Sequence, residues 1–229
     1  MYSLKKFLEE KKMTLIVSLP ENNLELAKAA LSEGADAVKM HVNVDHRASG
    51  NKFHSTEAYM EVFHQIRSEY SGPLGIVPGG SFKDIQQSEM NLLSKIGFDY
   101  FSIYANHMPS WMMKLHPIEK TFAIPANYSH ETLGLVNKLG ITALEASIIP
   151  GEEYGSPLTF QDILTYGSLV DKMDVPVLIP SQRSLVEDDL FLLHQAGVKG
   201  VMLGAIVVGQ TVESIKEKVS SFRNAMDQI

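Results

Sequence analysis

The stretch Gly34-Ala-Asp-Ala-Val-Lys39 decides how this chain is expected to fold, because its frame recurs three more times. The further copies are Gly97-Phe-Asp-Tyr-Phe-Ser102, Gly140-Ile-Thr-Ala-Leu-Glu145 and Gly197-Val-Lys-Gly-Val-Met202. Each glycine follows a segment of helical periodicity, so it stands where a helix commonly ends on a residue without a side chain. A short apolar run comes next in each copy, which predicts a buried strand.

Four more apolar runs alternate with these copies, and each of them leads into a proline. The eight predicted strands are Met13–Pro20, Ala35–Asn43, Gly72–Gly79, Phe98–His107, Lys120–Asn127, Ile141–Pro150, Val175–Ser181 and Val198–Val207. Segments of helical period separate them, and the one around Trp111–Leu115 has the weakest pattern. Eight strand–helix units in an odd and even alternation favour a closed (β/α)₈ TIM barrel over an open doubly wound sheet. We expect one such α/β domain over residues 1–229, preceded by a short N-terminal helix.

Composition narrows the class of protein. Of 229 residues, 45% are hydrophobic and 21% are charged, and the net charge is −7. This charge argues against nucleic acid or an anionic membrane as the main partner, although it leaves room for a local site for one small anion. The chain has no cysteine, which excludes disulfides, thiol nucleophiles and Cys-bound metals. A charged N-terminal stretch and the lack of a long apolar run lead us to expect a cytoplasmic protein.

The four glycines also predict which side chains share a layer inside the barrel. Alternate residues of a barrel strand face the interior. Counting from each glycine gives one layer formed by Lys39, Ser102, Glu145 and Met202. The layer nearer the mouth is then His41, Tyr104, Ser147 and Gly204, with Asn43 and Asn106 at the rim.

A lysine and a glutamate in one interior layer are costly to desolvate separately, so Lys39 and Glu145 are expected to pair. Two interpretations stay open: an ion pair that only fixes strand register, or a pair that transfers a proton or polarises a carbonyl. Under the second interpretation His41 and Tyr104 assist as catalytic residues. The polar side chains expected to bind the substrate are Ser18, Asn43, Asn106, Asn127 and Ser147.

Two loops carry further polar groups. The loop of residues 44–54 contains Asp45, His46 and His54, but no second cluster or zinc-type spacing supports a metal, so we assign neither a metal nor a cofactor. The segment of residues 151–157 has the composition of a mobile lid or of a plain solvated loop. The apolar segment of residues 108–113 is either core or the contact surface of a homodimer.

The end of the chain predicts a phosphate site. The seventh predicted strand leads into Ser181-Gln-Arg183-Ser, and the eighth ends in Leu203-Gly-Ala205-Ile. In barrels of this kind the loops after strands seven and eight commonly hold a phosphate, and small residues let backbone N–H groups approach it. We therefore expect Gly204 and Ala205 to bind a phosphate, with Arg183 adding a bidentate contact.

These last residues, together with Gly34-Ala-Asp-Ala-Val-Lys39, resemble the ribulose-phosphate-binding group of (β/α)₈ barrels, and within it the N-acetylmannosamine-6-phosphate 2-epimerases. The resemblance implies a phosphorylated metabolite, with Gly204 and Ala205 at its phosphate and Arg183 near the ligand. That family has a catalytic lysine after strand three and a glutamate after strand seven. This chain has Val77-Pro78 and Ile179-Pro180-Ser181 there, so the family's chemistry does not carry over.

The sequence thus predicts an isomerase, epimerase or carbon–carbon lyase that acts on a small phosphorylated carbonyl metabolite. Lys39 and Glu145 would provide acid/base or Schiff-base chemistry. A non-catalytic barrel that binds a phosphometabolite is one alternative, because prolines replace the acid and base of the resembled family. A prenyl- or glyceryl-phosphate transferase is another. A homodimer is possible.

Overall fold

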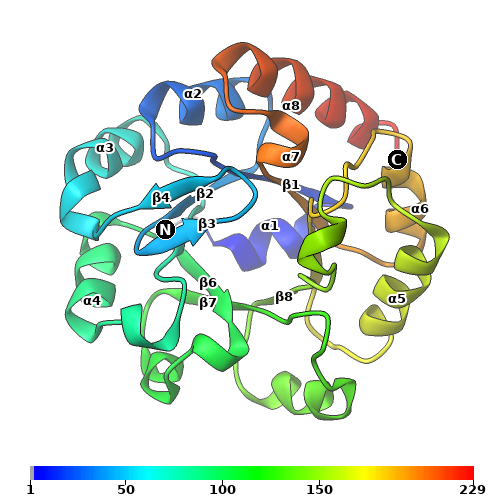
Figure 1. Cartoon of the computed structure of the whole chain (residues 1–229), viewed down its shortest axis with the longest axis horizontal. Helices are drawn as coiled ribbons and strands as arrows, with labels where there is room; N and C mark the ends of the chain where they lie inside the picture. Colours follow the sequence, from blue (N-terminus) through cyan, green and yellow to red (C-terminus); the bar gives the residue numbers. More distant parts are fainter. Residues whose placement is uncertain (1–2) are drawn as a thin grey trace.

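The computed structural model describes residues 3–229 and shows a ring of eight parallel strands with helices around it (Figure 1). The barrel strands are β1 (Thr14–Ser18), β2 (Ala37–His41), β5 (Leu74–Val77), β6 (Tyr100–Tyr104), β7 (Glu119–Ala123), β8 (Ala143–Glu145), β9 (Val177–Pro180) and β10 (Gly200–Leu203). Each strand pairs with the next along the chain, and β10 pairs with β1 to close the ring. The predicted TIM barrel is therefore confirmed.

Helices lie outside the strands, except α1 at one end of the barrel. The α-helices are α1 (Leu4–Glu10), α2 (Leu24–Ser32), α3 (Thr56–Glu69), α4 (Gln87–Ile96), α5 (Phe160–Val170), α6 (Asp189–Gln195), α7 (Ala205–Val208) and α8 (Val212–Met226). Shorter 3₁₀ segments are η1 (Phe82–Asp84), η2 (Ala105–His107), η3 (Ser110–Lys114), η4 (His130–Lys138) and η5 (Gly151–Glu153). The four repeat glycines have φ between 68° and 107°, the left-handed conformation that the helix ends require.

Three predicted segments differ from the structure. The loop of residues 44–54 contains an antiparallel hairpin of β3 (Val44–His46) and β4 (Asn51–Phe53), whose three-residue strands are too short to show an alternating pattern. The expected helix around Trp111–Leu115 is the 3₁₀ segment η3, which begins after Pro109. The predicted eighth strand ends at Leu203, and the apolar residues 205–208 form α7, because a short apolar run suits a helix as well as a strand.

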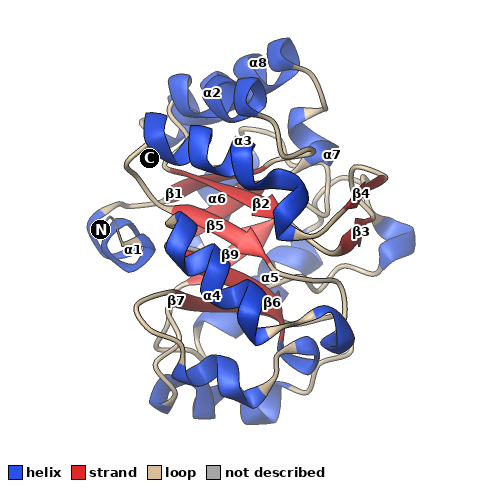
Figure 2. Ribbon diagram, turned by 90° about the vertical axis from the view of Figure 1, so that its left-hand side faces the viewer, coloured by secondary structure: helices blue, strands red, loops and turns tan. Residues whose placement is uncertain are grey.

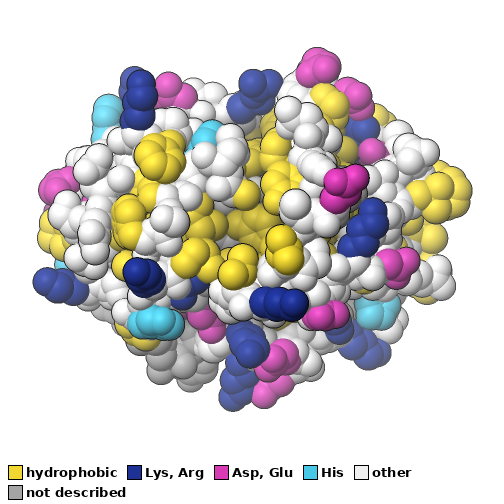
Figure 3. All heavy atoms as spheres, turned by 90° about the horizontal axis from the view of Figure 1, so that it is seen from below, with side chains coloured by type: hydrophobic (Ala, Val, Ile, Leu, Met, Phe, Trp, Pro, Cys, Tyr) yellow, Lys and Arg dark blue, Asp and Glu magenta, His cyan; other side chains and the backbone are white. Residues whose placement is uncertain are grey.

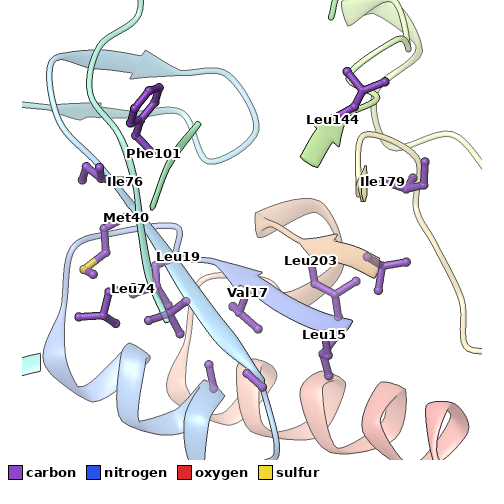
Figure 4. Close-up of a cluster of buried hydrophobic side chains, with 14 of the residues drawn as sticks. Leu15, Val17, Leu19, Met40, Leu74, Ile76, Phe101, Leu144, Ile179 and Leu203 are labelled. Atoms are coloured by element: carbon purple, nitrogen blue, oxygen red, sulfur yellow. The ribbon is translucent and has the colours of Figure 1, made fainter. Parts of the chain in front are cut away.

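Two apolar cores fill the molecule. The outward side chains of the strands, among them Leu15, Val17 and Leu203, pack between the barrel and the helices (Figure 4). A smaller cluster lies inside the barrel and includes Leu4 and Leu8 of α1, both no more than 1% exposed. The helix α1 closes one end of the barrel and the β3–β4 hairpin lies at the other (Figure 2). None of the described helices is long and apolar enough to cross a membrane.

The surface has charges of both signs. The face that is lowest in Figure 1 is hollowed near its centre, and hydrophobic side chains gather there among scattered charged groups (Figure 3). In the segment of residues 108–113, Met112 is fully buried, and Met108 and Trp111 pack against the core. This segment therefore contributes to the core, and the homodimer stays a prediction.

Candidate active site at the barrel mouth

A cavity of about 600 Å³ lies at the carboxyl ends of the barrel strands. This is the end at which the loops of a TIM barrel form active sites. All eight interior positions that the glycine register predicted line this cavity: Lys39, His41, Ser102, Tyr104, Glu145, Ser147, Met202 and Gly204. The register of the strands, read from the sequence, therefore places these side chains on the correct face.

Lys39 and Glu145 form an ion pair at the floor of the cavity. They come from β2 and β8, which lie on opposite sides of the ring. The Lys39 ammonium donates to both oxygens of the Glu145 carboxylate at 3.0 Å, and the two residues are 5% and 4% exposed. Two further interior residues, Tyr100 and Met202, belong to the inner apolar cluster of the barrel. The pair is thus almost fully buried and nevertheless lines the cavity.

Neutral polar groups surround this pair. The Nε2 atom of His41 lies 3.4 Å from the Ser18 hydroxyl, whereas its Nδ1 atom has no hydrogen-bond partner within residues 3–229. Burial lowers the pKa of His41 well below its ordinary value, and nearby His46 and Lys39 lower it further, so this imidazole is neutral at pH 7. Burial and the neighbouring Tyr154 phenol raise the pKa of Tyr104 to about 12, which keeps its hydroxyl protonated.

The β3–β4 hairpin lies over the floor pair on the β2 side. Its His46 and Phe53 rings lie 4.4 Å and 4.8 Å from the His41 ring, centre to centre. Burial and the charge of Lys39 lower the pKa of His46 to about 4. Although His41 and His46 are adjacent, the described residues contain no group of three metal-ligating side chains.

Arg183 does not reach this cavity. Its guanidinium donates to both Asp162 carboxylate oxygens, at 2.9 Å and 3.1 Å, and lies 2.7 Å from the Glu153 carboxylate. A third contact is the hydrogen bond to the Ser156 hydroxyl. The residue instead lines a separate cavity beside α5. The structure therefore does not bring the predicted phosphate-binding arginine together with the other site residues.

Of the three asparagines predicted to bind the substrate, one lines the cavity and two do not. Asn127 lines the cavity, as do Ser18 and Ser147. Asn43 turns away, since its side-chain amide donates to the Glu89 carboxylate of α4 at 2.7 Å. Asn106 is exposed on η2 and is not part of the cavity wall.

At the predicted phosphate site the structure puts one glycine in the cavity wall and a helix directly after it. Gly204 lines the cavity, and its N–H donates to the Ser181 hydroxyl at 2.7 Å. Ala205 begins α7, so its own N–H and that of Ile206 have no partner inside the helix.

Polar residues of the cavity wall that were not predicted as site residues include Arg47, Tyr154 and Gln182. The Gln182 amide donates to the Tyr154 hydroxyl at 2.5 Å, and its carbonyl accepts from the Ile149 N–H at 3.1 Å. Gln182 is the second residue after β9, and this position at the carboxyl end of a barrel strand could have identified it as a site residue. The others lie on loops, whose conformation the periodicity of the sequence does not indicate.

No protein-family model matches the chain, and neither does any curated protein sequence. Among solved structures, it is similar to a thiamine phosphate pyrophosphorylase from Pyrococcus furiosus, with 16% identity and a TM-score of 0.66 over 95% of this chain and 97% of that one. A tryptophan synthase A-subunit from the same organism is 15% identical, with a TM-score of 0.68 over 98% of this chain and all (100%) of that one. A protein from Aquifex aeolicus VF5 is 14% identical, with a TM-score of 0.72 over 98% and 99%. At these identities the likeness establishes the shared barrel and does not single out the N-acetylmannosamine-6-phosphate epimerases.

Proposed function

We propose that this protein is an enzyme that transfers a proton on a small phosphorylated carbonyl compound, as an isomerase or epimerase. The observation that carries the proposal is the Lys39–Glu145 pair, which is buried and yet faces the cavity. Two buried charges are expensive to keep, and apolar side chains often fix a fold as well as an ion pair does. A charged pair at the floor of an open cavity is therefore best explained by chemistry on a ligand.

The geometry suits proton abstraction next to a carbonyl. In this scheme the Glu145 carboxylate takes the proton from the carbon, and the electron pair of the broken C–H bond moves to the carbonyl oxygen. The Lys39 ammonium stabilises the negative charge that forms on that oxygen. Return of the proton to the other face of the same carbon re-forms the carbonyl and completes an epimerisation. Return of the proton to the former carbonyl carbon completes an isomerisation, in which the hydroxyl proton of the first carbon passes to the former carbonyl oxygen and the new carbonyl forms at the first carbon.

The remaining wall fits the rest of such a substrate. Ser18, Ser102, Ser147 and the protonated Tyr104 hydroxyl offer hydrogen bonds to hydroxyl groups of a sugar-like chain. The N–H groups that begin α7, from Ala205 and Ile206, offer donors for the phosphate. The names of two similar barrels, thiamine phosphate pyrophosphorylase and tryptophan synthase, belong to enzymes, which is consistent with a catalytic role.

Carbon–carbon cleavage through a Schiff base on Lys39 is the second branch, and we place it behind proton transfer. A Schiff base needs an amine that is free to attack a carbonyl. Here both Glu145 oxygens hold that nitrogen at 3.0 Å. If borohydride with candidate substrates leaves an adduct on Lys39, the order of the two branches is reversed.

The test is solvent-deuterium exchange. A panel of aldose and ketose phosphates is incubated with the protein in D₂O, and proton NMR follows the C–H group beside the carbonyl. We expect exchange with at least one compound, and a rate at least about 100-fold lower in Glu145→Gln. The matched control is Glu152→Gln, which makes the same change at an exposed position. Retained exchange in Glu145→Gln contradicts the proposal, and binding without exchange by the wild type favours the non-catalytic barrel.

A further inference from the structure

Arg47 is a charged residue of the cavity wall for which neither the fold nor the proposed chemistry accounts. It lies on the β3–β4 hairpin and is exposed. Its guanidinium lies over the Tyr154 ring, 5.9 Å from the centre, and packs against Gly151. The hairpin therefore extends across the mouth to the segment that follows β8.

The charge of Arg47 is not neutralised within residues 3–229, where no carboxylate lies within ion-pair distance of its guanidinium. The acidic residue nearest in sequence, Asp45, instead lies 3.8 Å from Lys52, and both side chains are largely exposed. The other two cations considered for the site are already paired, Lys39 with Glu145 and Arg183 with Asp162. Arg47 is thus a guanidinium of the cavity wall that has its planar set of donors free for an anion.

A second observation points to a ligand in the same cavity. His41 lines the cavity, is only 2% exposed, and has an Nδ1 atom without a partner in the described part of the chain. Buried polar atoms are nearly always satisfied, so an orphan in a cavity wall indicates a ligand or a water molecule. The ring of His46, the residue directly before Arg47 in the hairpin, lies 4.4 Å from the His41 ring at an angle of 41°.

The hairpin is also fastened next to the start of α8. The Gln210 side-chain amide donates to the Ser49 carbonyl at 3.1 Å, and the Asn51 amide donates to the Pro20 carbonyl at 2.8 Å. Gln210 lies two residues after α7, so the tip of the hairpin lies on the side of the mouth where the proposed phosphate donors are found.

We propose that Arg47 binds the anionic group of the substrate and is a specificity-determining residue of this site. The role that the sequence suggested for Arg183 then belongs to the hairpin. An anion at the mouth places the carbon chain of the ligand toward the floor, where the Lys39–Glu145 pair lies. The identification of that anion as a phosphate ester rests on the proposed function.

Isothermal titration with inorganic phosphate tests the inference on the intact protein. We compare the wild type with Arg47→Gln and with Lys52→Gln, which removes another exposed cation from the same hairpin. We expect at least about 10-fold weaker binding in Arg47→Gln, since a charge-assisted bidentate contact is lost, and no change in Lys52→Gln. The NMR signal of the Arg47 Nε–H group should also shift as phosphate is added.

The inference is overturned by phosphate binding that Arg47→Gln leaves intact, and by a wild type that does not bind phosphate. Equal losses in Arg47→Gln and Lys52→Gln also overturn it, because they indicate a general effect of charge. Inorganic phosphate has no carbonyl group, so this titration fails or succeeds independently of the deuterium exchange at Glu145. The proton-transfer proposal therefore remains testable whatever the titration shows.

Discussion

The ion pairs Arg183–Asp162 and Lys39–Glu145 are both buried near the mouth of the barrel, and their surroundings differ. Arg183 and Asp162 are enclosed by groups that satisfy them: the Asp162 carboxylate also accepts from the N–H and the hydroxyl of Thr159, which caps α5. Within residues 3–229, the side chains of Lys39 and Glu145 hydrogen-bond only to each other, and they face a cavity of about 600 Å³.

This difference indicates that the Arg183–Asp162 pair stabilises the fold, whereas the Lys39–Glu145 pair is available for function. Burial alone would raise the pKa of Asp162, but hydrogen bonds from Arg183 and Thr159 outweigh it and lower this pKa below its ordinary value. The carboxylate is therefore held as an anion that joins α5 to the end of β9. The floor pair instead spans the barrel interior from β2 to β8 and lines the cavity, so its free face is available to a ligand. The variants below test this division.

The largest effect on stability is expected at Arg183. Arg183→Met leaves Asp162 buried without its cation, and we expect the free energy of unfolding to fall by about 3–5 kcal/mol. Urea unfolding measures this loss. The control is Lys199→Met at an exposed position, which should stay within about 0.5 kcal/mol of the wild type. A loss below about 1 kcal/mol in Arg183→Met would show that this pair does not hold the loops together.

A smaller effect is expected at the floor. Lys39→Met should cost less than about 3 kcal/mol, because water in the cavity solvates the Glu145 carboxylate that remains. The double variant Lys39→Met/Glu145→Gln removes both charges and should return to within about 1 kcal/mol of the wild type in urea unfolding. If the double variant is as unstable as Arg183→Met, the floor pair serves the fold and the two pairs do not differ.

Acid should weaken the β3–β4 hairpin and the Arg183–Asp162 pair at different pH values. The pKa of His46 is about 4 in the folded protein and about 6.5 ordinarily, so the unfolded chain takes up the proton first as the pH falls. Stability from the hairpin region is therefore lost between pH 6.5 and pH 4. Asp162 has a lowered pKa, so its contribution is present above its ordinary value of 3.8 and is lost only as the pH falls below it.

Urea unfolding at pH 7 and pH 5 measures the histidine effect. The wild type should be less stable at pH 5, and His46→Phe should show a smaller difference between the two conditions. A variant of the exposed His54, His54→Asn, controls for the loss of a histidine from the same segment. An unchanged pH difference in His46→Phe would contradict the assignment.

The smallest effect is expected at Gly151. A methyl group there would meet the end of the Arg47 side chain, which is flexible and can move aside. Gly151→Ala should therefore leave the free energy of unfolding within about 0.5 kcal/mol of the wild type. Phosphate binding should weaken a few-fold, because the Arg47 side chain can no longer pack against residue 151 over the mouth of the barrel. Titration with phosphate measures this, and unaltered affinity would show that the contact with Gly151 does not position Arg47.

The same contrast explains what could be predicted from the sequence. Lys39 and Glu145 lie on regular strands, where a period of two and a shared glycine fix the side of the barrel that each residue faces. Arg183 lies just beyond a strand, where the backbone leaves that period and its partners come from a distant capping box. Asn43 adopts φ 53° and thereby leaves the alternation that put it at the rim. Residues after the end of a strand require the conformation of the loop, which sequence spacing does not give.

The most direct test of the central claim combines the floor variant with deuterium exchange on the active compound of the sugar-phosphate panel. The protein is Lys39→Met/Glu145→Gln, which we expect to be as stable as the wild type. The account predicts that exchange of the proton beside the carbonyl falls at least about 100-fold in this folded variant. Exchange at the wild-type rate would contradict the account, because it would leave the Lys39–Glu145 pair without a part in the chemistry.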